Sequence, residues 1–308
     1  MTRLLLRKLL LIILLVPLLH LLGFFYAASH PAANVEGTGG DPAGANPITY
    51  SAYLQQIFNG DLGQVGSAPI SEIIVTSVKN SLVLLALTLV IVILVGPLLG
   101  YLSISRRTQR VTTLSLAITL AGASLPGFFL GVAIIALMIY GIIRTGSGLP
   151  LPLSGYGLDN HLILPVLVLA IGPTLQVIRV TANMLENELH QDYVRVAQSQ
   201  GLSWPAVFWR HTLPNVISAI ILAIGRSARS LIGGLIVAEA LFLWPGIGRI
   251  FTFAIGIRID GREPLNYYLH PQLLATLAVV FGLGLLLADL LTNLFAHQLD
   301  PRLRYDLK

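Results

Sequence analysis

The chain has 308 residues, of which 55% are hydrophobic and only 11% are charged, and its mean hydropathy is +0.80. A soluble domain carries about 25% charged residues, so this composition excludes an ordinary water-soluble protein and indicates a chain solvated mainly by lipid. Cysteine is absent, which excludes disulfides, thiolate nucleophiles and thiolate metal sites. The net charge of +5 forms no basic patch interleaved with stacking aromatics, which argues against nucleic acid as a partner.

Six apolar segments follow one another along the chain. They span approximately residues 9–28, 81–102, 111–143, 162–182, 216–243 and 273–296. A helix needs roughly 20 residues to cross a bilayer, and backbone groups in lipid must be hydrogen-bonded within a helix or a closed barrel. Runs of this length exclude barrel strands, so we expect an all-α integral membrane protein with six transmembrane helices.

These segments divide the chain into three regions: a first transmembrane helix at residues 1–28, an extracytoplasmic segment at 29–80, and a five-helix core at 81–308. The first region has a basic start, as a cleaved signal peptide does, but its apolar run exceeds the usual length of about 7–15 residues. The second region opens with a Gly/Pro/Ala-rich stretch that we expect to be irregular, followed by a short amphipathic helix at 50–58.

Basic residues gather on one side of the membrane. Six crossings place both termini on the same side, where the short segments and helix ends hold twelve Lys and Arg, against five on the opposite side. Because cytoplasmic loops carry the excess of Lys and Arg, we expect both termini in the cytoplasm.

The most polar stretch of the core is DYVRVAQSQGLSWPAVFWRHTLP, residues 192–214. Its Asp, Arg, His and Gln side chains are too costly for a lipid-facing helix. Gly201 can end one short helix, and Ser203 can cap a second helix that has Pro205 in its first turn. We therefore expect a helix–turn–helix on the membrane surface, where another protein can bind.

Four segments resemble those of the dipeptide/oligopeptide subfamily of ABC importer permeases. Within residues 192–214, the spacing of Ala197, Gly201 and Leu213–Pro214 resembles the subfamily's EAA loop. The other three are GDLG at 60–63, PGFFLG at 126–131 and DPRLRY at 300–305, in the family's order. Two features depart from the pattern. Residues 30–58 lack the family's usual LPGDP motif. Arginines also occupy positions 226 and 229, where the family usually has uncharged residues.

The resemblance implies an ABC importer type I permease fold with a cytoplasmic coupling helix, in a loop at residues 185–214. It also implies the inner membrane of a bacterial or archaeal cell, a heterodimer with a second permease, two cytoplasmic ATPase subunits and an extracytoplasmic solute-binding protein. The chain has no GxxxxGK[ST] loop, so ATP and Mg²⁺ are expected on the ATPase subunits, with no catalytic residue, metal or cofactor in this chain. The implied coupling residues are Asp192, Tyr193, Arg195, Ala197, Gly201, Leu202, Leu213 and Pro214.

Two arginines in the fifth segment are the clearest indication of the cargo. Arg226 lies about 12 residues beyond Pro214, near mid-bilayer, and Arg229 follows on about the same side of the helix. Facing lipid there costs roughly 2.5–3.5 kcal/mol, so both should face protein or water. They either bind an anionic group of the cargo or form an ion pair, with Asp289 or with the partner subunit.

Asn80 and Gln176 are further candidates for the translocation pathway, with helix packing as the alternative. Glu239 with the following PGIG resembles the subfamily's E-x-x-F-x-x-PG-x-G, and we expect a turn with the glutamate reaching to the interface. Tyr53 and Trp244 are expected among the aromatic residues of the membrane–water interface.

We therefore expect the permease subunit of an ATP-driven importer for peptides or a similar small solute, working by alternating access. Nickel chelates and glycosides stay open as cargo. A secondary transporter driven by an ion gradient is one alternative, and it leaves the surface helix–turn–helix unexplained. An intramembrane enzyme is another, but the chain has no GxSG, and Asp289 is its only Asp deep within an apolar run.

Overall fold

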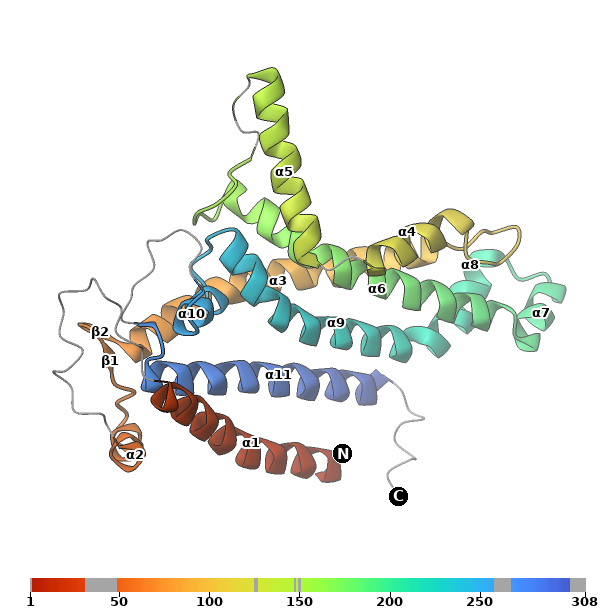
Figure 1. The fold of residues 1–308 in the computed structure, drawn as a ribbon. Coiled ribbons are helices and arrows are strands. Elements are labelled where there is room, and N and C mark those ends of the chain that lie inside the picture. The colour runs from red at the N-terminus through yellow and green to blue at the C-terminus, as the bar shows by residue number, and fades with distance from the viewer. Residues whose placement is uncertain are drawn as a thin grey trace.

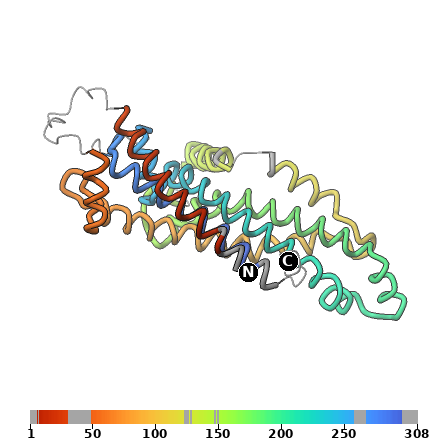
Figure 2. The backbone as a smooth tube through the Cα atoms, turned by 90° about the horizontal axis from the view of Figure 1, so that it is seen from below, coloured from red at the N-terminus to blue at the C-terminus, as the bar shows by residue number. Residues whose placement is uncertain are grey.

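The computed structural model describes residues 2–30, 49–124, 127–146, 148, 151–257 and 267–299. Five long helices extend along a common axis as one elongated bundle (Figures 1 and 2). They are α1 (Thr2–Ser29), α3 (Ile70–Leu102), α6 (Ile163–Leu189), α9 (Leu213–Leu241) and α11 (Pro271–Leu299). Side-by-side contacts run in the order α3, α6, α9, α11 and α1, so α1 packs on the rim of the bundle against α11.

Each of these five helices is long and apolar enough to cross a membrane. The expectation of an all-α membrane protein is thereby confirmed. The expected third crossing, at residues 111–143, is instead divided into α4 (Thr113–Ser124) and α5 (Gly127–Thr145). The helix α5 runs across the long axis and is seen nearly end-on in Figure 2. Pro126, which lies outside the described residues, falls in the gap, and a proline there removes one helical hydrogen bond.

One end of the bundle carries the short elements of the second region. They are α2 (Tyr50–Phe58), which confirms the expected short helix, and the strands β1 (Gln64–Val65) and β2 (Ala68–Pro69). The strands pair antiparallel, with Gln64 opposite Pro69. The helix α10 (Ile247–Ala254) lies at the same end, beyond α9 (Figure 1). Residues 31–48, expected to be irregular, lie outside the described residues.

Two aromatic residues at this end differ from the expectation of an interface position. Trp244 and Tyr53 are completely buried. The Trp244 ring nitrogen donates a hydrogen bond to the Asn80 carbonyl, and the Tyr53 hydroxyl donates to the Gln272 carbonyl, at 3.1 and 3.2 Å. Burial raises the pKa of the Tyr53 hydroxyl, which favours its neutral, donating form. Both rings satisfy their polar atoms inside the protein, so they pack between elements and do not form an interface belt.

Candidate functional site

At the opposite end of the bundle a helical hairpin, residues 192–212, connects α6 to α9 (Figure 1). It consists of α7 (Asp192–Ser199), α8 (Trp204–Val207) and the π-helical turn η3 (Phe208–Thr212). This confirms the helix–turn–helix expected from the polar sequence. The N-terminal end of α1 and the C-terminal end of α11 both point toward the end of the bundle that carries this hairpin.

Gly201 makes the turn of the hairpin through its backbone conformation. Its φ is +81°, and two hydrogen bonds close the end of α7: Leu202 N–H to the Ala197 carbonyl at 3.3 Å, and Gly201 N–H to the Gln198 carbonyl at 3.0 Å. This is a Schellman motif. An added Cβ would meet no atom within 4 Å, so the requirement for glycine comes from φ and not from crowding.

Ser203 occupies the N-cap position of α8 with an extended backbone, as expected, but its side chain makes no capping hydrogen bond. Only its carbonyl takes part in the helix start, accepting from Val207 N–H at 3.0 Å. The expectation of a side-chain cap was therefore wrong. The extended Ser203 backbone and Pro205 are enough to begin this four-residue helix.

The inner face of the hairpin is apolar and packs against the long helices. Val194, Ala197, Val207 and Phe208 are buried in one cluster with Leu185 and Leu189 of α6 and Val216 and Ile220 of α9. The Phe208 ring also lies 4.5 Å from the Tyr101 ring of α3, measured between centroids. Ala197, a predicted coupling residue, therefore faces the bundle. The hairpin, α6 and α9 share one hydrophobic core.

The outer face of the hairpin carries most of the other predicted coupling residues. Arg195 and Asp192 form a 3.7 Å ion pair with side chains 69% and 97% exposed, so solvent screens the pair. Val196 and Trp209, which the sequence did not single out, are further exposed apolar residues of the hairpin. The exposed members of the predicted coupling set are Asp192, Tyr193, Arg195, Gly201, Leu202 and Pro214, whereas Leu213 packs at the edge of the apolar cluster.

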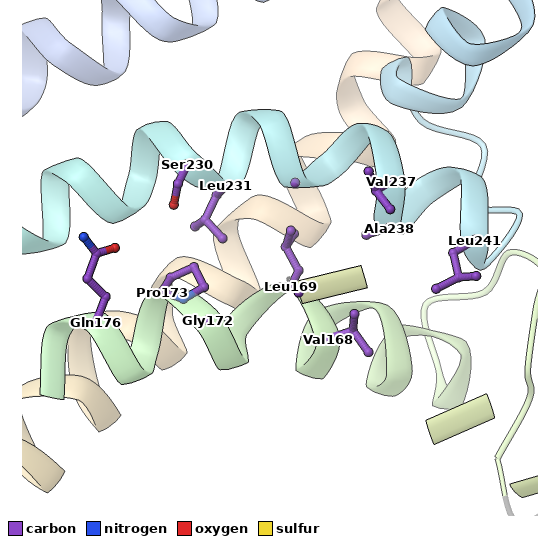
Figure 3. Close-up of a pocket in the computed structure, with 12 residues that line it drawn as sticks. Val168, Leu169, Gly172, Pro173, Gln176, Ser230, Leu231, Val237, Ala238 and Leu241 are labelled. Atoms are coloured by element: carbon purple, nitrogen blue, oxygen red, sulfur yellow. The ribbon is translucent and has the colours of Figure 1, made fainter. Parts of the chain in front are cut away.

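A groove of about 290 Å³ lies between α6 and α9, next to the start of α5. Its lining is mainly apolar and includes Val168, Leu169, Val237, Ala238 and Leu241. Figure 3 shows polar groups at one end, where Gln176 reaches from α6 toward α9 and Ser230 faces α6. The groove therefore offers an apolar wall with a polar end.

The two predicted pathway arginines have different surroundings. Arg226 is not among the residues that line the groove; it lies on α9 four residues, about one helical turn, before Ser230 at the polar end. Its side chain is exposed, and its Nε donates to the Leu222 carbonyl one turn earlier, at 3.4 Å. Within the described part of the chain no carboxylate lies within ion-pair distance of Arg226.

Arg229 forms an ion pair instead. Its guanidinium lies 2.8 Å from Asp289 of α11, and the other oxygen of that carboxylate pairs with Lys8 of α1. One acidic residue thus holds two basic residues from two other helices. This arrangement is the ion pair that the sequence offered as the structural alternative for Arg229.

Asn80 also has packing partners. Its side-chain amide donates to the Pro245 carbonyl at 2.8 Å, which attaches α3 to the turn between α9 and α10. The groove lining does not include Asn80, whereas it does include Gln176. The two residues predicted together therefore lie in different surroundings.

Glu239 is completely buried and does not reach the interface, contrary to the expectation. Its carboxylate accepts from Ser81 Oγ at 2.5 Å, from Gly248 N–H at 2.6 Å and from Arg249 N–H at 3.3 Å. Glu239 thus joins α9 to α3 and to the N-terminal end of α10. A Cβ at Gly248 would lie 2.6 Å from Ile236 Cα. The glycine of the PGIG motif therefore allows the backbone of α10 to approach α9 closely enough for the Gly248 N–H to reach Glu239.

Comparison with known proteins gives a consistent result. Residues 93–305 match the family model described as the binding-protein-dependent transport system inner membrane component. The oligopeptide transport system permease protein AppB of Bacillus subtilis is 28% identical over 272 residues, which cover 85% of this chain and 83% of AppB. The glutathione transport system permease protein GsiC of Salmonella paratyphi A is 27% identical, over 84% of this chain and 79% of GsiC.

A solved structure supports the fold. A chain of the MetNI methionine ABC transporter, in an inward-facing conformation, aligns with a TM-score of 0.57 and 17% identity. The alignment covers 76% of this chain and 99% of that chain. The bundle is therefore the fold of an ABC importer permease.

Proposed function

The chain belongs to the family of binding-protein-dependent transport system inner membrane components, the permease subunits of ABC importers, and we propose that its cargo is a peptide or a similar small solute. The curated relatives are named as permeases for oligopeptides, dipeptides and glutathione, which supports this class of cargo. The family assignment also favours an importer over the two alternatives, a secondary transporter and an intramembrane enzyme.

The proposed complex contains a second permease as heterodimer partner, two cytoplasmic ATPase subunits that bind ATP and Mg²⁺, and an extracytoplasmic solute-binding protein. The chain is a multi-pass inner-membrane protein, and both termini lie in the cytoplasm in this proposal. Its regions are the first transmembrane helix (1–28), the extracytoplasmic segment (29–80) and the core (81–308) with the coupling loop (185–214). The excess of Lys and Arg on the hairpin side supports this orientation.

The hairpin is the proposed contact with the ATPase subunits. Its outer face carries Asp192, Tyr193, Arg195 and Leu202, and its inner face is fused with α6 and α9. When the ATPases close on ATP, the hairpin moves as a rigid unit with these two helices. The groove between the same two helices then changes its width, which is the alternating-access step.

Arg226 and Gln176 are the proposed pathway residues that meet the cargo. A cation about one helical turn beyond the polar end of an apolar groove is suited to a solute with a carboxylate and an apolar portion, as peptides have. Arg229 is assigned to the structure of the bundle, because Asp289 already neutralises it. Asn80 stays a pathway prediction with a packing hydrogen bond as its alternative role.

The observation that carries the coupling proposal is the exposed hairpin whose buried face continues into the helices of the groove. The test is chemical cross-linking within the co-expressed complex. The chain is expressed with its partner permease and the ATPase subunits, and a cysteine at Leu202 is cross-linked. A cross-link to an ATPase subunit is expected, and a hairpin that reacts only with reagents on the outer side of the membrane would contradict the proposal.

A further inference from the structure

A cluster of polar groups connects the helical hairpin to both helices that it joins. The Tyr193 hydroxyl, in the first turn of α7, donates to Glu188 Oε1 at 2.5 Å and lies 3.3 Å from the His211 carbonyl. The Asn215 side-chain amide, in the first turn of α9, lies 2.8 Å from the same Glu188 oxygen. It also lies 3.1 Å from the Tyr193 hydroxyl and 3.1 Å from the His211 carbonyl. We call Glu188, Tyr193 and Asn215 the hairpin cluster.

The members of the hairpin cluster come from three different elements. Glu188 is in the last turn of α6, Tyr193 is at the start of α7, and Asn215 is at the start of α9. The cluster lies on the exposed side of this junction, whereas Val194 and Ala197 hold the buried side. The hairpin is therefore attached to the bundle on both of its sides.

The two attachments have different mechanical properties. Apolar side chains hold surfaces together without a preferred direction, so α7 can slide or rotate over its apolar contacts. Hydrogen bonds depend steeply on distance and angle, and a bond to a carboxylate is stronger than a neutral one. A shared carboxylate oxygen with two donors from two helices therefore fixes the angle of α7 to α6 and to α9 together.

We propose that Glu188 and Asn215 are positioning residues that hold α7, through the Tyr193 hydroxyl, at a fixed angle to α6 and α9 and so transmit hairpin movement to the groove. The proposal rests on the proposed coupling function of the hairpin. Tyr193 lies on the exposed face of the hairpin, and the proposal assigns its hydroxyl to the contacts with Glu188 of α6 and Asn215 of α9. Without the hairpin cluster, the hairpin would still bind the ATPases but would turn on its apolar base, so ATP would be hydrolysed with less transport.

The test measures solute transported per ATP hydrolysed in the complete complex, in liposomes with its binding protein and a peptide. Tyr193→Phe removes only the hydroxyl, and Asn215→Leu removes the amide with little change in volume. Each is expected to lower transport per ATP about three- to tenfold, the effect of one lost hydrogen bond. Glu188→Gln keeps an acceptor oxygen and should retain most of the ratio. Tyr156→Phe, which removes a hydroxyl from another exposed tyrosine, is the matched control.

The double variant Tyr193→Phe/Asn215→Leu separates a shared cluster from two independent contacts. A ratio no lower than that of the worse single variant is expected, because either change disrupts the same cluster. Effects that multiply would overturn the proposal, as would a lower yield of complex with a normal ratio in the complexes that assemble. If the proposed coupling function were wrong, the unaltered chain would transport the peptide without ATPase subunits. That result is distinct from a change in the ratio of transport to ATP hydrolysis in the variants.

Discussion

At the scale of single residues, two carboxylates in this chain connect helices that are far apart in the sequence. Glu239 connects α3, α9 and α10, and Asp289 connects α1, α9 and α11. Glu239 is completely buried and the Asp289 side chain is 25% exposed. A carboxylate withdrawn from water is costly unless donors surround it, so these two acids constrain the positions of their donors. The stability of the bundle should therefore be sensitive to single changes at such positions.

Gly248→Ala tests the site around Glu239. The new Cβ would lie 2.6 Å from the Ile236 backbone, so α10 must move away and the Gly248 N–H bond to the carboxylate is lost. We expect a loss of about 1.5–3 kcal/mol, the usual contribution of a hydrogen bond to a charged group. Thermal unfolding of the purified complex measures it. Gly141→Ala, where a Cβ meets no atom within 4 Å, is the control, and equal unfolding temperatures for the two variants would refute the account.

The two arginines of α9 form a matched pair for testing the cargo site. Arg226→Gln should reduce uptake of carboxylate-bearing peptides about tenfold while assembly stays normal, since Arg226 has no described carboxylate partner to lose. Arg229→Gln should instead reduce the yield of complex, because it leaves Asp289 with Lys8 alone. Co-purification and uptake in the same vesicles measure both. If Arg226→Gln instead lowered the yield of complex and Arg229→Gln lowered uptake, Arg229 would be the cargo residue and Arg226 the structural one.

The sequence predicted residues with backbone or charge requirements better than those with tertiary partners. Gly201 was predicted in its turn, because a glycine between two short polar helices has few other roles. Glu239 and Trp244 were predicted to lie at the membrane–water interface, because each side chain carries a polar group on an apolar stem or ring. Their partners, Ser81 and Asn80, lie about 160 positions away, and no local pattern connects residues across that separation.

At the scale of elements, the turn of the hairpin depends on one backbone angle. Gly201→Val puts a β-branched residue at φ +81°, which costs about 1–3 kcal/mol of strain, although the space for a Cβ is open. We expect weaker ATPase association and lower transport from an inserted, full-length chain. Gln200→Val is the control, because its φ of −78° suits any residue. Normal association and transport in Gly201→Val would show that the turn is unimportant for coupling.

The length of the apolar runs predicted five of the six helices in the expected order, and the proline at position 126 predicts a kink or break in the third run, but the run did not predict how α4 and α5 pack. A continuous apolar run and a broken one have the same composition, and only the proline in the middle distinguishes them. Where each half packs is decided by α6, which contacts both. The packing of α4 and α5 therefore depends on tertiary contacts that the sequence of the apolar run does not contain.

At the scale of the whole molecule, the orientation in the membrane is testable because the chain has no cysteine. A single cysteine at Ser199 on the exposed hairpin should react with an impermeant thiol reagent only after the cytoplasm is opened. A cysteine at Gly39, outside the described residues, should react in intact cells. The excess of Lys and Arg on the hairpin side is the physical reason. If the cysteine at position 199 reacted in intact cells and the one at position 39 did not, the chain would have the opposite orientation in the membrane.

The central claim is that this chain is the permease of an ATP-driven importer, with the helical hairpin as the coupling element. The most direct measurement is peptide uptake by liposomes that contain the chain, its partner permease and the ATPase subunits, with binding protein on the opposite side. The account predicts uptake that requires ATP hydrolysis and is lower in Gly201→Val. Uptake driven by an ion gradient in liposomes without the ATPase subunits would contradict it.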